Sequence, residues 1–225
     1  MIDRLTDHAR RVLDLAEEEA SRFRHRYVGP EHVLLGVLRE GASGAAELLR
    51  ARGMELEAAR SGLGRLAEQG VVASPALSDA ELLSMLGIDL DAVRQRTQRT
   101  FGSQAVAQAT REATRARRRG VGRVAWTPLC GPPFLAKRVV GLAHRQAGAF
   151  GSVGIGPELL LLGVLDDISE PWPRCMSNRW RRRLLAYVDL PADYRGAARP
   201  LLEAFGVDRA ELRDALVAQV GEVPR

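Results

Sequence analysis

The sequence predicts an all-α fold, with two pseudo-repeats of a four-helix unit, an extra helical hairpin between them and an insertion in the second repeat. Three observations support this prediction. Of the 225 residues, 46% are hydrophobic and 5% aromatic, and Ala, Leu and Arg, which lose little entropy in helices, are abundant. Few stretches show the alternation of apolar and polar residues that is typical of strands. A long segment also occurs twice.

The duplication can be read directly from the sequence. Residues 9–38 and residues 136–165 align at a constant offset of 127 without a gap, and 15 of the 30 positions are identical. Average residue frequencies would give about two identities. Each half of the chain therefore contains a copy of one unit.

Each copy is predicted to form two helices joined by a short turn. The first helix has apolar residues at helical spacing, namely Val12, Leu15, Ala16, Ala20 and Phe23, or Val139, Leu142, Ala143, Ala147 and Phe150. The second helix begins at a Gly-Pro-Glu sequence, at residues 29–31 and 156–158. Proline loses no hydrogen bond there, and the acid meets the positive end of the helix dipole. Gly36 and Gly163 are expected to permit close contact between helices.

A second unit occurs three times, at residues 48–60, 82–94 and 201–213. Each copy has a short helix, a glycine, an apolar residue, an acid and a new helix. The glycine can adopt the left-handed conformation that ends a helix, and Asp208 with Glu211 forms a capping box. We therefore predict three helical hairpins. Their glycines are Gly53, Gly87 and Gly206, and their acids are Glu55, Asp89 and Asp208.

These patterns divide the chain into three parts. Residues 1–67 form the first repeat. Residues 134–221 form the second, with 26 extra residues in an insertion at about 166–199. Residues 68–133 lie between them and contain the extra hairpin. Within this part we predict a connection at 68–80, a strongly basic helix at 102–119 and a Gly- and Pro-rich loop at 120–133.

Composition limits the location and the cofactors. Cys130 and Cys175 are far apart and have no metal-ligand spacing, which favours a reduced, cytoplasmic protein without metal or cofactor. The N-terminus opens with charged residues, so we expect no signal peptide. The longest apolar run, residues 159–165, is too short to span a membrane.

Two arginine clusters indicate an alternative function. The net charge is +5, and Lys137 is the single lysine among 33 basic residues. The clusters lie at residues 111–123 and 174–183. A nucleic-acid-binding regulator would contact phosphates through them. A solvated face or an acidic protein partner is favoured over nucleic acid, because no recognised nucleic-acid fold accompanies the clusters. The arginines concerned are Arg115, Arg117, Arg118, Arg119, Arg181, Arg182 and Arg183.

Three stretches resemble a known family. MIDRLTDHARRVLDLAEEEA, VGPEHVLLGVLREG and AAELLRARGM are similar to the N-terminal domain of the Clp unfoldases, which has two four-helix pseudo-repeats. The resemblance covers residues 1–67 and 134–221. It implies a non-catalytic module that binds proteins or peptides, including arginine-phosphorylated ones and the adaptors of a Clp unfoldase. Such a module would modulate Clp-dependent proteolysis or sequester peptides.

The resemblance also implies the site residues. In the family, a glutamate at the start of the second helix of each repeat pairs with phosphoarginine, and the matching residues are Glu31 and Glu158. A hydroxyl matching Thr6 lies near the first site, and His32 follows Glu31. The second repeat lacks this hydroxyl and imidazole, so binding is expected first in residues 1–67. Without the family, both glutamates are first-turn acids that complement helix dipoles, and His32 is a partly exposed helical residue.

The sequence contains no recognisable catalytic arrangement. The phosphate loop G-x-x-x-x-G-K-[ST] does not occur. Neither cysteine has a predicted base or orienting group beside it. We therefore expect no enzymatic activity.

Overall fold

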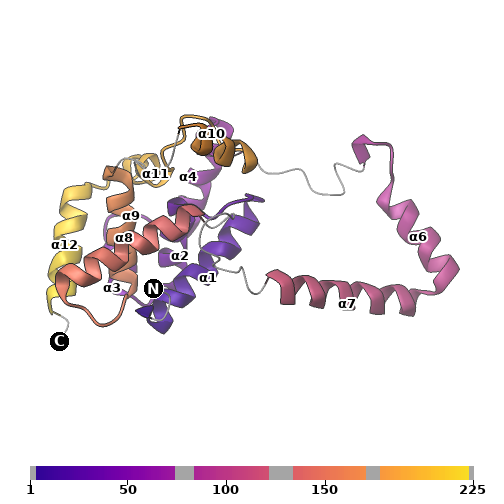
Figure 1. The fold of residues 1–225 in the computed structure, drawn as a ribbon, viewed down its shortest axis with the longest axis horizontal. Coiled ribbons are helices and arrows are strands. Elements are labelled where there is room, and N and C mark those ends of the chain that lie inside the picture. The colour runs from indigo at the N-terminus through magenta and orange to yellow at the C-terminus, as the bar shows by residue number, and fades with distance from the viewer. Residues whose placement is uncertain (1–3, 74–83, 122–133, 171–177, 223–225) are drawn as a thin grey trace. The chain divides into compact units, whose positions relative to one another are not determined.

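The structure is a computed structural model that describes residues 4–73, 84–121, 134–170 and 178–222. These residues contain eleven α-helices and one isolated parallel bridge, between Leu5 and Ile155. The predicted all-α fold is confirmed (Figure 1). The chain divides into two compact units, one of Met1–Pro75 with Pro132–Arg225 and one of Ala76–Gly131.

Both repeats lie in the first unit and contain the four predicted helices. The first repeat has α1 (Asp7–Arg22), α2 (Pro30–Glu40), α3 (Gly44–Arg50) and α4 (Leu56–Glu68). The second has α8 (Phe134–Phe150), α9 (Pro157–Ser169), α11 (Ala198–Ala204) and α12 (Arg209–Glu222). The insertion contributes α10 (Asn178–Tyr187), between α9 and α11. Pro30 and Pro157 begin α2 and α9, as predicted.

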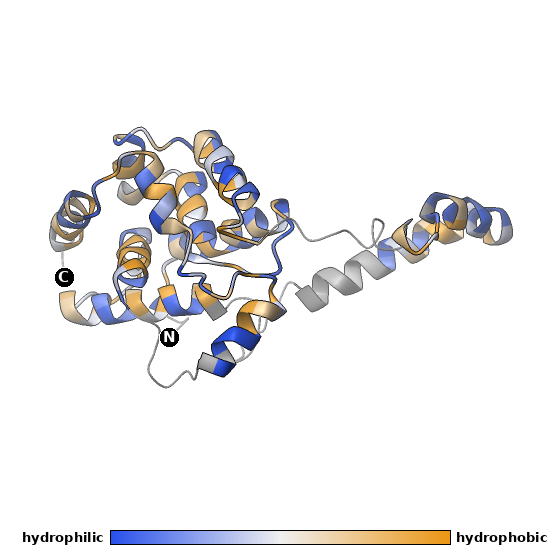
Figure 2. Cartoon of the chain, turned by 90° about the horizontal axis from the view of Figure 1, so that it is seen from above, coloured by the Kyte–Doolittle hydropathy of each residue, from blue (hydrophilic) through white to orange (hydrophobic). Residues whose placement is uncertain are grey.

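The core of this unit surrounds α2 and α9, which contact each other across the two repeats. Nearly every residue of α2 is buried, and so are most residues of α9. Apolar and polar residues alternate along the helices of this unit (Figure 2). Among the helices of the described residues, none is both long and apolar enough to cross a bilayer.

The first two helices of each repeat, α1 with α2 and α8 with α9, pack closely because a glycine lies at their contact. A Cβ atom on Gly36 of α2 would overlap the carbonyl oxygen of Val12 in α1 and would lie 3.1 Å from the backbone nitrogen of Ala16. Gly163 makes the equivalent contact between α9 and α8. The prediction that these glycines permit close helix contact is confirmed.

The predicted ends of the hairpin helices are also present. Gly53, Gly87 and Gly206 have φ angles of 77°, 77° and 64°, in the left-handed region that glycine adopts without strain. Asp89 and Asp208 each accept two backbone N–H hydrogen bonds at the start of the helix that follows. The glycine is therefore used as predicted in all three hairpins, whereas Glu55 makes no side-chain capping hydrogen bond at the start of α4.

The second unit contains α6 (Leu90–Phe101) and α7 (Ser103–Val121), which contact each other. The predicted basic helix is α7, and it continues two residues into the expected loop at 120–133. The rest of that loop, most of the connection at 68–80, and both cysteines lie outside the described residues.

The glycine contact predicts an asymmetric effect of added methyl groups. Gly36→Ala should lower the free energy of unfolding by about 1–3 kcal/mol, because the methyl group forces α1 and α2 apart. Gly148→Ala is the matched control, since no atom lies within 4 Å of a Cβ there. It should raise stability by up to about 1 kcal/mol through helix propensity. Chemical denaturation measures both, and equal effects would contradict the packing.

Candidate functional site

The repeats meet so that each of the two helix-starting glutamates faces the other repeat. Glu31, in the first turn of α2, accepts a hydrogen bond of 3.3 Å from the backbone N–H of Ala197, just before α11. Glu158, in the first turn of α9, accepts one of 3.4 Å from the backbone N–H of Ala45 in α3. Each glutamate therefore belongs to a site that both repeats build.

An open pocket of about 560 Å³ surrounds Glu158, which is half-buried. The pocket is lined by apolar side chains, by hydroxyl, amide and imidazole groups, and by small residues. These include Thr6, His8, Ser43, Ser152, Gly154 and Gln219. At its edge, His8 Nδ1 lies 2.6 Å from Glu40 Oε1, and this carboxylate raises the pKa of His8.

Glu31, in contrast, is completely buried. The hydroxyl of Tyr194, in the insertion, donates to its carboxylate and lies 3.0 Å from Oε1 and 2.9 Å from Oε2. Burial, together with the charge of Glu31, raises the pKa of Tyr194 well above its ordinary value. The structure thus gives Glu31 partners within the chain, and its predicted role as a ligand contact stays a prediction.

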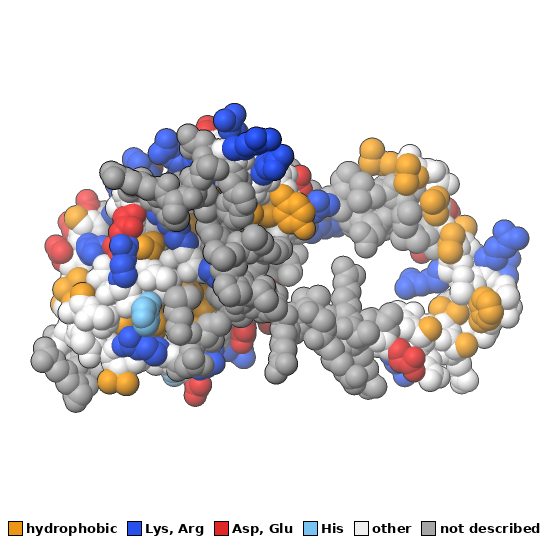
Figure 3. Space-filling model, in the orientation of Figure 1, with side chains coloured by type: hydrophobic (Ala, Val, Ile, Leu, Met, Phe, Trp, Pro, Cys, Tyr) orange, Lys and Arg blue, Asp and Glu red, His pale blue; other side chains and the backbone are white. Residues whose placement is uncertain are grey.

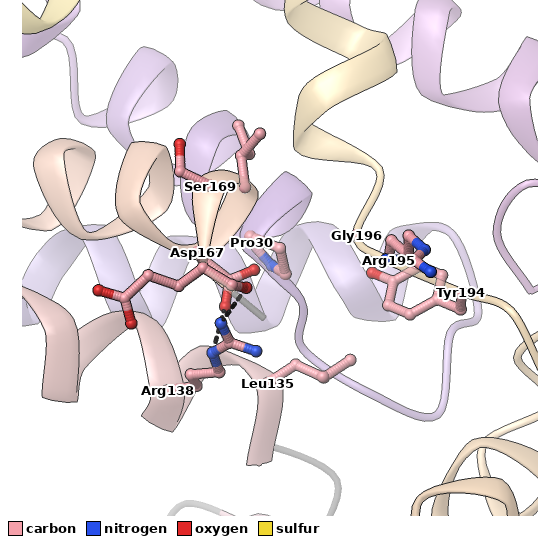
Figure 4. Close-up of a pocket in the computed structure, with 10 residues that line it drawn as sticks. Pro30, Leu135, Arg138, Asp167, Ser169, Tyr194, Arg195 and Gly196 are labelled. Atoms are coloured by element: carbon pink, nitrogen blue, oxygen red, sulfur yellow. Dashed lines mark hydrogen bonds and ion pairs between the residues drawn. The ribbon is translucent and has the colours of Figure 1, made fainter. Parts of the chain in front are cut away.

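A second, smaller pocket of about 200 Å³ lies next to Tyr194 (Figure 4). Pro30 and Leu135 line it, and Arg138 points toward Asp167, with 2.9 Å between Nε and Oδ1. Burial raises the pKa of Asp167 to about 6, although Arg138 opposes this shift. An ion pair within the chain therefore occupies the polar side of this pocket.

In the structure, Thr6 lies at the Glu158 site and not at the Glu31 site. Because α1 and α2 run antiparallel, the start of α1 lies beside the end of α2, where His8 contacts Glu40. An eleven-residue helix rises about 16 Å, which separates this end from Glu31. Thr6 instead lines the pocket of Glu158. The expectation that Thr6 lies near Glu31 is therefore wrong.

His32 belongs to the core. The prediction that it is partly exposed is therefore wrong. Its side chain has no exposed surface. Its Nδ1 accepts a hydrogen bond of 2.9 Å from the Gly29 N–H, and its Nε2 lies 2.9 Å from Nδ1 of His25. Burial lowers the pKa of His25 to about 4 and that of His32 to about 3. Both rings are therefore neutral at physiological pH, and His32 lines neither pocket described above.

The arginine clusters lie in different units. Arg181, Arg182 and Arg183 are in α10, where the last two are exposed, and basic side chains gather over this helix at the upper edge of Figure 3. Residues 115–119 lie in α7, and their side chains are outside the described set. Nothing in this arrangement tests the nucleic-acid alternative, which stays a prediction.

The open pocket presents a carboxylate beside hydroxyl, amide and imidazole groups. A planar cation that donates several hydrogen bonds, such as a guanidinium group, is complementary to Glu158. Within the described residues, no three His, Cys, Asp or Glu side chains are grouped as a metal ion requires. The fold and its sites define a duplicated all-α domain with an acid at each of two places where the repeats meet.

Comparison with known proteins gives a family match for the first part of the chain. Residues 4–80 match the Clp repeat (R) N-terminal domain. The chain is 49% identical over 57 residues to the negative regulator of genetic competence ClpC/MecB of Bacillus subtilis, which covers 25% of this chain and 7% of that protein. It is 27% identical over 222 residues to the chloroplastic chaperone ClpC of Pisum sativum, covering 99% of this chain and 16% of the relative.

A solved structure extends the comparison to the fold. The N-terminal domain of the caseinolytic protease associated chaperone ClpD of Arabidopsis thaliana aligns with 97% of this chain and 95% of its own, at a TM-score of 0.52 and 16% identity. Residues 4–80 are therefore a Clp repeat N-terminal domain, and the chain has the fold of a Clp N-domain. It spans 7% and 16% of the two relatives named above.

The buried histidines predict acid sensitivity. Their folded-state pKa values lie below the ordinary 6.5, so at intermediate pH the unfolded chain binds more protons, and stability falls as the pH falls. His32→Leu introduces the residue that the second repeat has at Leu159. Between about pH 7 and 5, the variant should lose about 2 kcal/mol less stability than the wild type.

Urea unfolding at several pH values measures this difference. The raised pKa of Asp167 acts in the opposite direction, because the folded state binds its proton more tightly. That contribution is common to both proteins and cancels in the comparison. Parallel stability curves for wild type and variant would contradict a neutral, buried His32.

Proposed function

We propose that this chain is a docking module of the Clp type, and that its Glu158 pocket binds arginine side chains of peptides and proteins. The observation that carries the proposal is an open pocket around a half-buried carboxylate, on a Clp N-domain fold. Glu158 accepts one long hydrogen bond from the described residues. Its remaining acceptor capacity is therefore available to a ligand.

The rest of the pocket supports a preference for phosphorylated arginine. A phosphoarginine carries a guanidinium group and a phosphate, which require an acceptor and donors close together. The hydroxyls of Thr6 and Ser43 lie in the same pocket as Glu158, where the first donates to the Ile155 carbonyl oxygen and the second bonds the Glu40 carboxylate. The raised pKa of His8 favours its protonated form near neutral pH, which adds a cationic donor.

A docking role requires no catalysis by this chain. We infer that its partners are the substrates or adaptor proteins of a Clp unfoldase, because the relatives that match are Clp chaperones and Clp ATP-binding subunits. By occupying such partners, the module would modulate Clp-dependent proteolysis or sequester peptides. The proposal depends on the pocket and not on the unit that contains α6 and α7.

The charge of Glu158 should dominate peptide affinity. Glu158→Gln keeps the shape of the side chain and should weaken binding of an arginine-phosphorylated peptide at least about tenfold, because a hydrogen bond to a charged group contributes on the order of 1.5 kcal/mol or more. Glu47→Gln is the matched control, since Glu47 is an exposed first-turn acid of α3 outside the pocket lining. Isothermal titration calorimetry measures both. Equal affinities for the two variants would refute the assignment.

His8 should control the preference for the phosphate. In the wild type, the ratio of affinities for phosphorylated and unmodified peptide should fall as the pH rises through the raised pKa of His8, because the imidazole loses its charge. In His8→Ala this ratio should be smaller and should vary less with pH. Fluorescence anisotropy with both peptides at several pH values measures it. A His8→Ala protein with an unchanged ratio would show that the phosphate lies elsewhere.

A further inference from the structure

The two pockets occupy matching places in the repeats but differ in size. The offset of 127 aligns Pro30 with Pro157 and His8 with Leu135. One residue of each pair lines the small pocket and the other lines the large one. The volumes are about 200 and 560 Å³. Glu158 lines the large pocket, whereas Glu31, its counterpart in the first repeat, does not line the small one.

Tyr194 accounts for this difference. Its side chain is 4% exposed, its hydroxyl bonds both oxygens of Glu31, and its ring packs edge-on against Tyr27 with the ring centroids 6.0 Å apart. The hairpins at residues 48–60 and 201–213 are offset by 153, and this offset aligns Tyr194 with Gly41. The offset of 127 aligns Tyr27 with Gly154. Both rings that close the first site are thus replaced by glycine at the second.

We infer that Tyr194 is a built-in occupant of the Glu31 site, so that the chain has one working ligand subsite, at Glu158, and not two. The binding part of this inference rests on the proposed function, whereas the closure of Glu31 does not. An external guanidinium would have to displace a buried ring and three hydrogen-bond contacts at Glu31. At Glu158 it meets one contact of 3.4 Å.

This inference also gives the insertion a role. Tyr194 lies in the segment at about 166–199 that contains the insertion, close to the start of α11. Before α3, the matching stretch of the first repeat is Gly41-Ala42-Ser43-Gly44, which contains no large side chain. Through Tyr194, the segment at about 166–199 therefore supplies to Glu31 the hydrogen-bond donor that an external ligand would supply to Glu158.

Carboxyl labelling tests the closure without any ligand. The folded chain is treated with a carbodiimide and an amine, and mass spectrometry measures the modification of Glu31 and Glu158. In the wild type, Glu31 should be modified at least about tenfold more slowly than Glu158, because it reacts only after local opening. Equal labelling of the two glutamates would overturn the inference. This measurement decides it even if a variant fails to fold.

Two substitutions at position 194 sharpen the test. Tyr194→Gly removes the ring and should raise the labelling of Glu31 at least about tenfold, as the closure of the site is lost. Tyr194→Phe removes the hydroxyl but keeps the ring, so Glu31 should stay slow to react. Circular dichroism confirms that each variant is folded. A folded Tyr194→Gly protein with Glu31 still unreactive would show that other groups close the site.

Calorimetry then gives the number of subsites. An arginine-phosphorylated peptide should bind the wild type with a stoichiometry of one, and its affinity should fall at least about tenfold in Glu158→Gln. A stoichiometry of two in the wild type would overturn the inference. If no peptide binds and Glu31 is still protected from labelling, the proposed function fails while Tyr194 remains the occupant of the Glu31 site.

Discussion

A buried carboxylate at the start of α2 sets the strongest constraint on this structure. Glu31 is fully buried, and a charge in such a place is tolerated only when hydrogen-bond donors surround it. Two of its donors, the hydroxyl of Tyr194 and the backbone N–H of Ala197, come from the second repeat. The second repeat must therefore lie against the first with the segment before α11 in a defined position. The contact of α2 with α9 and the Leu5–Ile155 bridge fit that arrangement.

The same constraint explains how two copies of one unit have diverged. Around Glu31, the first repeat has His25, Tyr27 and His32. The rings of His25 and Tyr27 stack, while His32 packs edge-on against His25 and Tyr194 packs edge-on against Tyr27. At the positions of His25 and Tyr27, the second repeat has small residues that line an open pocket. One copy of the site has become part of the hydrophobic core, while the other has kept room for a ligand.

Much of the fold could be predicted from the sequence, because helix starts, glycine ends and the offset of 127 are local signals. The Gly36 contact follows from such a signal as well. The sites depend on which repeat faces which, and that is set by the packing of α2 on α9, which leaves no trace in local sequence. Thr6 was therefore placed beside the wrong glutamate. Tyr194 was missed because the repeat alignment pairs it with Gly41, which has no side chain and therefore suggests no role for this position. The alignment of Tyr27 with Gly154 in the two repeats was the signal available in the sequence that the pockets differ in size.

A duplicated site allows a division of labour that a single site does not. An open pocket stabilises a fold little, because its polar groups remain hydrated and its walls lose packing contacts. At Glu31, the equivalent groups are bonded within the chain and surrounded by packed rings, so they fix the relative position of the repeats. The Glu158 pocket lies between the same two repeats and inherits that fixed geometry. The packed Glu31 site therefore holds the repeats in the position that keeps the Glu158 pocket open. The difference between the two sites is a property of the whole domain.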